Sequence, residues 1–258
     1  MPELMTAPRF FYPFGLSEST TITLPDQSAH HARRVLRLRE ASAIILFNGQ
    51  GGQYPATIHF EGKRATARLG PYQDHEVELP GKLRLLQALA GGEKMDWIIE
   101  KAVELGVTAF QPVAAERSIM QLRDERLHKR MQHWQRIIFA ASAQCGRNRL
   151  MQLEPLDRLD KLLPPLASHG HKQGLFICHP EYGTPLSEAL GQWRKTPATT
   201  LNLLIGPEGG WSDDELAMAQ HHGAEPVQFG QRVLRTETAG LALAAASIAL
   251  LGWDKPAT

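Results

Sequence analysis

Two short segments in the last quarter of the chain carry the residue types best suited to chemistry. The first, residues 205–210, reads IGPEGG and completes the apolar run Leu203, Leu204 and Ile205. Such a run is typical of a strand buried on both faces, and the glycines after it let the backbone approach a ligand closely. The pattern predicts that a ligand binds at this turn.

The second segment, residues 232–238, reads RVLRTET and precedes a long apolar stretch. Ordinary helix capping explains part of it, because Thr236 or Thr238 can cap a helix and Glu237 favours its positive end. It does not explain Arg232 and Arg235, since cations are disfavoured there unless an anion or polar ligand compensates. S-adenosylmethionine would suit a site of backbone amides, carbonyls and glycine, but composition alone does not select that ligand.

The elements around these segments predict an α/β architecture. The turn leads to the S-x-x-E pattern of Ser212 and Glu215, a capping box that begins a helix, and Gly223 ends it. Strand patterns and helix patterns alternate from Lys82 onward. The expected strands are 83–89, 107–113, 174–180, 201–206 and 226–229, and the expected helices are 93–106, 123–144, 184–193, 212–223 and the apolar stretch after 238. Such alternation indicates a parallel sheet with sites at the carboxyl ends of its strands.

The first 70-odd residues show a different pattern. Asn48-Gly49, Gly51-Gly52 and Glu61-Gly62 separate apolar runs, as in hairpins, which predicts a small β-barrel or sandwich. One short helix is expected, capped by Asp26 or Ser28, with Ala32, Val35 and Leu36 on its apolar face. A polar, proline-ended linker follows at residues 73–80, so two domains are predicted, at 1–74 and 75–258.

The overall charge of +1 hides two basic segments. Residues 1–74 carry eight basic and six acidic side chains, and residues 116–149 carry eight and three. A charge run on a helix is usually a solvated face. The basic segments therefore have two interpretations, a solvated surface or a surface that binds nucleic acid.

Several other classes are disfavoured. Cys145 and Cys178 stand far apart, which fits a reducing cytosol better than a disulfide framework. The start has no secretory signal pattern, and the longest uncharged stretch is too short for a membrane span. P-loop, G-x-G-x-x-G and G-x-S-x-G motifs are missing from the sequence. The adjacent pairs His30-His31 and His221-His222 have no further ligands nearby, so no metal site is expected.

Several motifs together resemble the RsmE family of 16S rRNA (uracil-N3)-methyltransferases. They are LLIGPEGGWSDDEL, GQRVLRTETAGLA, GEKMDWIIEKAVELGV, AQCGRNR, PRFFY and HHARRVLRLRE, and they extend over nearly the entire chain. The resemblance implies a cytoplasmic homodimer with a PUA-like β-barrel domain for RNA and a SPOUT domain of knotted parallel sheet with helices on both faces. S-adenosylmethionine would bind in the trefoil knot, near the dimer interface.

The resemblance also implies site residues. Those expected to bind the cofactor are His179, Pro180, Ile205, Gly206, Pro207, Glu208, Gly209, Gly210, Phe229, Gly230, Val233, Leu234 and Thr236. Arg235, Thr236 and Glu237 would border the target base. Arg235 or Arg9 would stabilise the uracil anion, and Glu237 would take the proton or hold an arginine in place. The expected contacts to 16S rRNA of the small ribosomal subunit are Arg9, Arg33, Arg34, Arg37, Arg117, Arg123, Arg147 and Arg149.

Two alternatives stay open. The chain could be an RNA-binding assembly factor that kept the fold without catalysis, although the intact RTET segment argues against this. It could also be a related SPOUT enzyme that methylates a ribose 2′-hydroxyl of tRNA. One departure from the expected pattern is Trp211, which is bulkier than the residue expected after GPEGG and is predicted to alter the loop.

Overall fold

The computed structural model describes residues 7–167, 173–196 and 198–255. The chain divides into two compact units. Unit 1 comprises Met1–Glu78 and Phe139–Leu150, and unit 2 comprises Leu79–Ile138 and Met151–Thr258. The chain therefore returns to unit 1 within the long helix α3, Asp124–Cys145.

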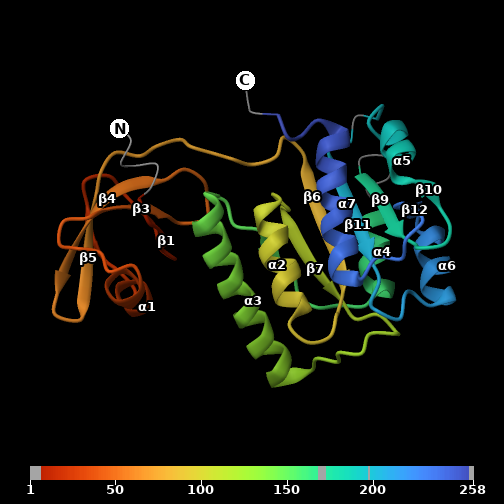
Figure 1. Ribbon diagram of the computed structural model, residues 1–258, viewed down its shortest axis with the longest axis horizontal. Coiled ribbons are helices and arrows are strands. Elements are labelled where there is room, and N and C mark those ends of the chain that lie inside the picture. The colour runs from red at the N-terminus through yellow and green to blue at the C-terminus, as the bar shows by residue number, and fades with distance from the viewer. Residues whose placement is uncertain (1–6, 168–172, 197, 256–258) are drawn as a thin grey trace. The chain divides into compact units, whose positions relative to one another are not determined.

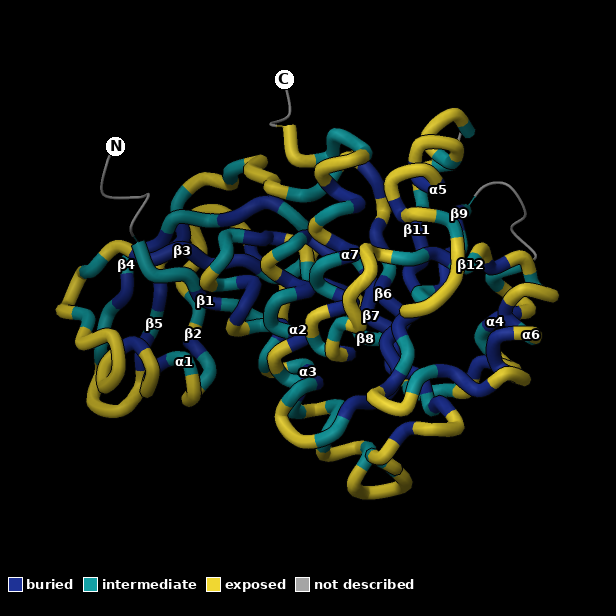
Figure 2. The backbone as a smooth tube through the Cα atoms, turned by 45° about the vertical axis from the view of Figure 1, so that its right-hand side comes forward, coloured by how far each residue is buried: buried dark blue, intermediate teal, exposed yellow. Residues whose placement is uncertain are grey.

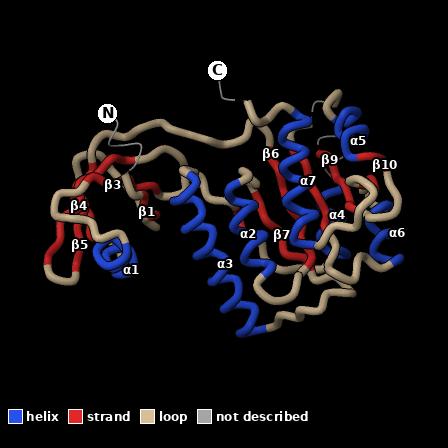
Figure 3. Tube along the Cα trace, in the orientation of Figure 1, coloured by secondary structure: helices blue, strands red, loops and turns tan. Residues whose placement is uncertain are grey.

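Within the described residues, unit 1 is built on a five-stranded sheet of order β1-β3-β4-β5-β2 (Figure 3). Its strands are β1 (Arg9–Phe11), β2 (Thr21–Thr23), β3 (Ala43–Phe47), β4 (Tyr54–Glu61) and β5 (Arg64–Leu69). The pairings are antiparallel except for that of β1 with β3. Gly62, at φ +59°, makes the turn that lets Glu61 pair with Arg64, which confirms the hairpin predicted there.

The short helix of unit 1 differs from the prediction. It consists of α1 (Asp26–His30), followed by the π-helical turn η2 (His31–Val35). Pro25 occupies the N-cap and no side chain caps the helix, so the expected cap at Asp26 or Ser28 was wrong. Ala32 is buried as expected, but Val35 and Leu36 are exposed, because the wider π turn rotates them away from the face that Ala32 shares with Ala29.

Unit 2 contains a parallel sheet of seven strands within its described residues, in the order β10-β12-β9-β11-β6-β7-β8 (Figure 1). The strands are β6 (Lys82–Ala88), β7 (Ala109–Val113), β8 (Gln152–Leu153), β9 (Gln173–Cys178), β10 (Thr184–Pro185), β11 (Thr200–Ile205) and β12 (Glu225–Gln228). The helices are α2 (Lys94–Glu104), the first part of α3, α4 (Leu159–Ala167), α5 (Leu186–Trp193), α6 (Asp213–His221) and α7 (Thr236–Leu251).

Helices cover both faces of this sheet. Leu86 and Leu204 belong to one buried cluster with Leu163 of α4 and Leu216 of α6. The neighbouring Leu85 faces the other way, because its side chain lies against Gly240 of helix α7. Alternate side chains of one strand point to opposite faces, so β6 is buried on both, as Figure 2 shows by its dark colour. The predicted α/β sheet is confirmed.

Two details of unit 2 escaped the sequence prediction. Helix α4 contains Pro164 and Pro165, residues that argue against a helix, and its place in the buried cluster overrides them. Helix α7 begins after Arg235, which is the N-cap without a side-chain cap, so the expected capping by Thr236 or Thr238 was wrong. Among the described residues, no helix is long and apolar enough to cross a membrane.

Candidate functional site

A cavity of about 680 Å³ lies in unit 2 where three loops meet. The loops follow strands β9, β11 and β12, the last of them running into helix α7. All thirteen residues predicted to bind a cofactor line this cavity. So do Arg235 and Arg117, whereas Glu237 does not. The expectation that a ligand site forms at the carboxyl edge of the parallel sheet therefore coincides with an actual cavity.

The glycine-rich turn, residues 206–210, owes its shape to close packing. A Cβ at Gly209 would lie 3.1 Å from Arg117 Cβ, and one at Gly206 would lie 3.3 Å from Trp211 Nε1. Gly210 adopts φ +69°, a conformation that side chains disfavour, and its amide donates to Pro207 O. These contacts hold the turn as a fixed wall of the cavity.

Thr236 connects that turn to helix α7. Its hydroxyl donates to Gly206 O at 2.6 Å and accepts from Gln87 Nε2 at 2.9 Å. Thr236 and Gln87 are both buried. The hydroxyl thus joins helix α7 to the glycine-rich turn and to strand β6, which explains why it does not cap its own helix.

Lys94 links the carboxylate of Glu208, which lines the cavity, to that of Glu237, which does not. Its Nζ lies 2.9 Å from Glu208 Oε1 and 3.4 Å from Glu237 Oε2. The Gly91 amide also donates to Glu208 Oε1, at 3.0 Å. Hydrogen bonding to Glu208 raises the pKa of Lys94. Burial alone would raise the pKa of Glu208, but Lys94 and two backbone hydrogen bonds together lower it. Both directions favour the charged pair.

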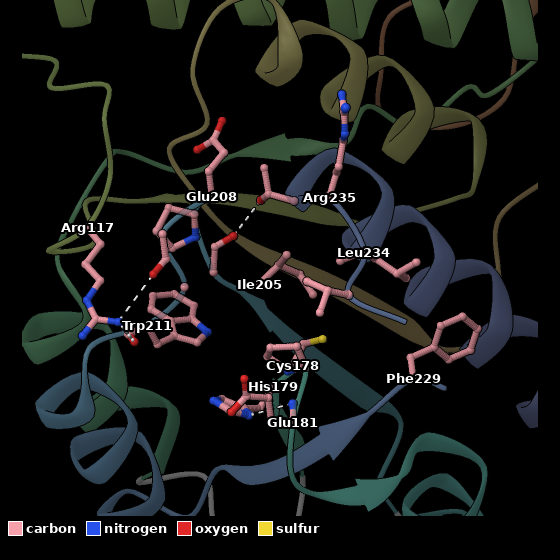
Figure 4. A pocket seen from close by; sticks show the side chains of 18 of the residues that line it. Arg117, Cys178, His179, Glu181, Ile205, Glu208, Trp211, Phe229, Leu234 and Arg235 are labelled. Carbon is pink, nitrogen blue, oxygen red and sulfur yellow. Dashed lines mark hydrogen bonds between the residues drawn. The ribbon is translucent and has the colours of Figure 1, made fainter. Parts of the chain in front are cut away.

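The two arginines of the RVLRTET segment stand apart from this network. Arg232 and Arg235 are exposed and line the cavity. Among the described residues, no hydrogen bond or ion pair engages either guanidinium. Figure 4 shows Arg235 and Glu208 extending away from Cys178 and His179, at the opposite end of the cavity. Two positive groups are therefore available to an incoming anion.

The opposite end of the cavity holds no activated nucleophile. Burial raises the pKa of the Cys178 thiol to about 11, so the thiol stays neutral near pH 7. His179 Nδ1 accepts from the amides of Glu181 and Tyr182, each at 3.2 Å, and burial lowers its pKa. His179 is therefore held as a neutral ring that shapes the loop.

Trp211 and Arg117 support the turn from behind. Trp211 is buried in the cluster that contains Leu86, Leu204 and Leu216. Arg117 Nη1 donates to Trp211 O at 3.1 Å and, more weakly, to Gly209 O at 3.4 Å (Figure 4). The bulky residue predicted to alter the loop is therefore a core residue, with its carbonyl and that of Gly209 held by one guanidinium.

The arginines predicted to contact RNA fall into two groups. In unit 1, Arg9 donates to Gln53 Oε1 at 2.5 Å and to Asn148 Oδ1, and burial lowers its pKa. Arg147 pairs with Glu78 through two hydrogen bonds, of 2.9 and 2.6 Å, and its side chain is 4% exposed. The others are exposed. They are Arg33, Arg34, Arg37 and Arg149 in unit 1 and Arg117 and Arg123 in unit 2.

Eight residues that line the cavity were not in the predicted site: Lys94, Cys178, Glu181, Trp211, Asp213, Leu216, Arg232 and Ala239. Lys94 lies within the quoted GEKMDWIIEKAVELGV motif, Cys178 directly precedes His179, and Arg232 begins RVLRTET. Lys94 was missed because a basic residue at the start of an amphipathic helix looks like ordinary surface charge. No group of three or more His, Cys, Asp or Glu side chains that could hold a metal ion occurs among the described residues.

Comparison with known proteins identifies the two parts of the chain. Residues 77–248 match a family described as an RNA methyltransferase domain, and residues 24–69 match an RNA methyltransferase PUA domain. The chain is 32% identical over 219 residues to ribosomal RNA small subunit methyltransferase E of Synechocystis sp., covering 85% of this chain and 70% of that relative. It is 27% identical over 236 residues to the protein of the same name from Bacillus subtilis, covering 88% and 89%.

Two solved structures of methyltransferases are similar to this chain over most of its length. Ribosomal RNA small subunit methyltransferase E from Neisseria gonorrhoeae, bound to S-adenosyl methionine, is 36% identical with a TM-score of 0.84, covering 95% of this chain and 98% of that chain. A Legionella pneumophila methyltransferase in complex with SAM is 31% identical with a TM-score of 0.85, covering 94% and 97%.

The chain combines a cavity at the carboxyl edge of a parallel sheet with an N-terminal PUA domain. Together with the matched RNA methyltransferase domain, these features define the class of RNA methyltransferases of the SPOUT type. The chain belongs to the ribosomal RNA small subunit methyltransferase E family. The predicted family and fold class are thereby confirmed, while threading of the C-terminal segment into a knot stays a prediction.

Proposed function

We propose that this chain methylates the N3 atom of a uridine in 16S rRNA of the small ribosomal subunit, with S-adenosylmethionine as methyl donor. The observation that carries the proposal is the meeting of three loops, after β9, β11 and β12, around one cavity. The naming of the relatives and the cofactor in two similar structures support the same conclusion.

The residues of the cavity fit S-adenosylmethionine. The volume of about 680 Å³ is within the range of small-molecule sites. Ile205, Leu234 and Phe229 offer apolar surface for the adenine ring, and Glu181 and Asp213 offer negative charge for the amino group and sulfonium. Trp211 Nε1, buried without a partner among the described residues, offers one more donor beside the cavity. When bound, the cofactor supplies an electrophilic methyl group and leaves as a neutral thioether.

Uracil needs help from the protein because its N3 atom carries a proton and is a poor nucleophile. Loss of that proton spreads negative charge onto the flanking carbonyl oxygens. A guanidinium beside those oxygens stabilises the charge as it develops. Arg235, exposed at the cavity and free of intramolecular partners among the described residues, is our first candidate for this role. Arg9 remains the second candidate.

Glu237 has two proposed roles, to accept the N3 proton or to hold a cation in place. Its Oε2 is buried and lies 3.4 Å from Lys94 Nζ. This contact supports the holding role, with a lysine in the place where an arginine was expected. Proton acceptance requires that the carboxylate reach the cavity once RNA is bound, and it stays the alternative.

RNA binding is assigned to a β-domain at 1–74 and methyl transfer to a SPOUT domain at 75–258. Arg33, Arg34 and Arg37 are exposed in the former and suit phosphate contacts. Arg117, Arg123 and Arg149 are also exposed and complete the proposed RNA surface. Arg147 was predicted to belong to this surface, but it is buried against Glu78 and suits a structural role better. We further propose that the protein acts in the cytoplasm as a homodimer, with its C-terminal segment threaded through a trefoil knot beside the cofactor.

The proposal is tested by incubating the protein and labelled S-adenosylmethionine with small subunits that lack this modification. The expected result is label in 16S rRNA as N3-methyluridine. If cofactor binds and no label enters the rRNA, the chain is better described as an RNA-binding assembly factor. Label in the ribose of tRNA would support the 2′-O-methyltransferase alternative.

A further inference from the structure

Lys94 lies between the acidic residues of the two segments 205–210 and 232–238. Glu208 belongs to the glycine-rich turn, and Glu237 belongs to the first turn of α7. Lys94 Nζ approaches both, at 2.9 and 3.4 Å, from the start of α2. These contacts tie together three segments that are distant in sequence.

The arrangement has a consequence for Arg235, which precedes Glu237 by two residues. Arginine pairs with carboxylates in a bidentate geometry and is the favoured partner wherever a carboxylate is unsatisfied. Glu208 accepts hydrogen bonds from Lys94 and from the Gly91 amide. Glu237 forms an ion pair with Lys94 at 3.4 Å, and this ion pair is the contact of its buried Oε2, which has no hydrogen-bond partner among the described residues. The Arg235 guanidinium is correspondingly exposed, with no intramolecular partner among the residues that the structure describes.

We propose that Lys94 is a positioning residue that occupies Glu208 and Glu237 and so keeps the Arg235 guanidinium available to the RNA substrate. The inference rests on the proposed function, in which Arg235 meets the RNA. Without the ammonium group, the carboxylates of Glu208 and Glu237 would be uncompensated and would capture the Arg235 guanidinium. The lysine acts through the arginine and does not itself contact the uracil.

The experiment measures RNA affinity and its salt dependence for four proteins: the full-length chain, Lys94→Met, Arg235→Ala and the double variant. The probe is unmodified small subunit, with cofactor affinity measured in parallel. Lys94→Met keeps the length of the side chain and removes its charge. We expect it to weaken RNA binding about tenfold, equivalent to about 1.4 kcal/mol, and to reduce the salt slope by about one.

The double variant distinguishes an indirect role from a direct one. If Lys94 acts through Arg235, the double variant binds RNA no more weakly than Arg235→Ala, because there is no guanidinium left to capture. An additive loss would overturn the inference, since it would mean that Lys94 contacts RNA itself or supports the fold independently.

A rescue variant guards against misfolding. Lys94→Met combined with Glu208→Gln and Glu237→Gln removes the carboxylates that would capture Arg235, and RNA affinity should return to within about threefold of the unmodified chain. Affinity is the readout because both glutamates belong to the proposed site and turnover would fall for other reasons. Failure of the rescue would count against the inference.

The outcomes separate this inference from the proposed function. If the unmodified chain methylates the small subunit but Arg235→Ala leaves RNA binding unchanged, the role of Lys94 is refuted and the methyltransferase assignment stands. If the unmodified chain transfers no methyl group to the small subunit, the proposed function itself fails.

Discussion

A cluster of arginines and polar side chains in unit 1 and another at the cavity of unit 2 are satisfied in opposite ways. In unit 1, Arg9 and Arg147 turn inward to Gln53, Asn148 and Glu78. In unit 2, Lys94 forms ion pairs with the carboxylates of Glu208 and Glu237, and Arg232 and Arg235 are exposed. The same residue type is structural in the first cluster and available to a ligand in the second. We infer that unpaired charge, more than arginine content, marks the proposed substrate site.

The largest expected effect concerns the inward cluster. Replacing Arg147 by Met leaves the Glu78 carboxylate, which is mostly buried, without its two hydrogen bonds. Breaking a buried pair in this way costs roughly 3 kcal/mol, measurable as a lower midpoint of thermal unfolding. Arg149→Met is the matched control, because Arg149 is 56% exposed beside Glu76 and should cost about 1 kcal/mol or less. Equal losses from both variants would remove the distinction between the clusters.

Arg235→Ala should act on catalysis with little effect on stability. Removing a group that stabilises developing charge typically lowers turnover about 10²- to 10³-fold. Methyl transfer to unmodified small subunits and cofactor affinity are the measurements, and cofactor affinity should hold within about threefold. Arg9→Ala is the comparison, for which we expect a lower unfolding midpoint as the main effect. A catalytic loss confined to Arg9→Ala would transfer the anion-stabilising role to Arg9.

Thr236→Val tests the junction between the glycine-rich turn and α7. The substitution keeps the shape and leaves Gly206 O and Gln87 Nε2 without their partner in a buried place. The expected loss of folding free energy is about 1–3 kcal/mol, accompanied by weaker cofactor binding. Thr236→Ser keeps the hydroxyl and should behave nearly as the parent. A silent Thr236→Val would show that the junction does not depend on this hydroxyl.

The smallest effect is a dependence of stability on pH. The folded-state pKa of Glu208 is lowered, so its ion pair contributes above the ordinary glutamate pKa of about 4.3 and is lost as pH falls through the folded value. The pKa of Lys94 is raised, so the contribution also disappears at alkaline pH, above the ordinary lysine value of about 10.4. Between these limits the contribution of the Lys94–Glu208 pair to stability should therefore be constant.

Lys94→Met provides the control for this pH dependence. Its unfolding midpoint should fall less on acidification than that of the parent chain, because Glu208 then keeps only its backbone hydrogen bonds. An identical acid limb in both proteins would show that the Lys94–Glu208 pair does not contribute to folding stability.

Much of the α/β part could be predicted from local pattern. The alternating strands and helices, the Ser212–Glu215 capping box and the stop of α2 at Gly106 all appear in the structure. Local rules suffice there because each element buries its apolar face in the expected period. The prediction for the helix of unit 1 was wrong because the helix departs from this period: its π turn leaves Val35 and Leu36 exposed.

Most of the residues that line the cavity could be predicted from the sequence, but the pairing of their side chains could not. The thirteen residues that were taken from motifs line it, because the motifs come from loops that meet at one edge of the sheet. The pairing of side chains was not predictable, since Lys94 and Glu208 are 114 residues apart. Sequence pattern likewise gave no sign that Arg147 is buried and Arg235 is exposed.

The most direct test of the account is nucleoside mass spectrometry of 16S rRNA from cells with and without this protein. N3-methyluridine should be present at one position when the protein is made and missing when it is not. Restoring the unmodified chain should restore the nucleoside, and restoring Arg235→Ala should not. Unchanged N3-methyluridine in cells without the protein would contradict the account.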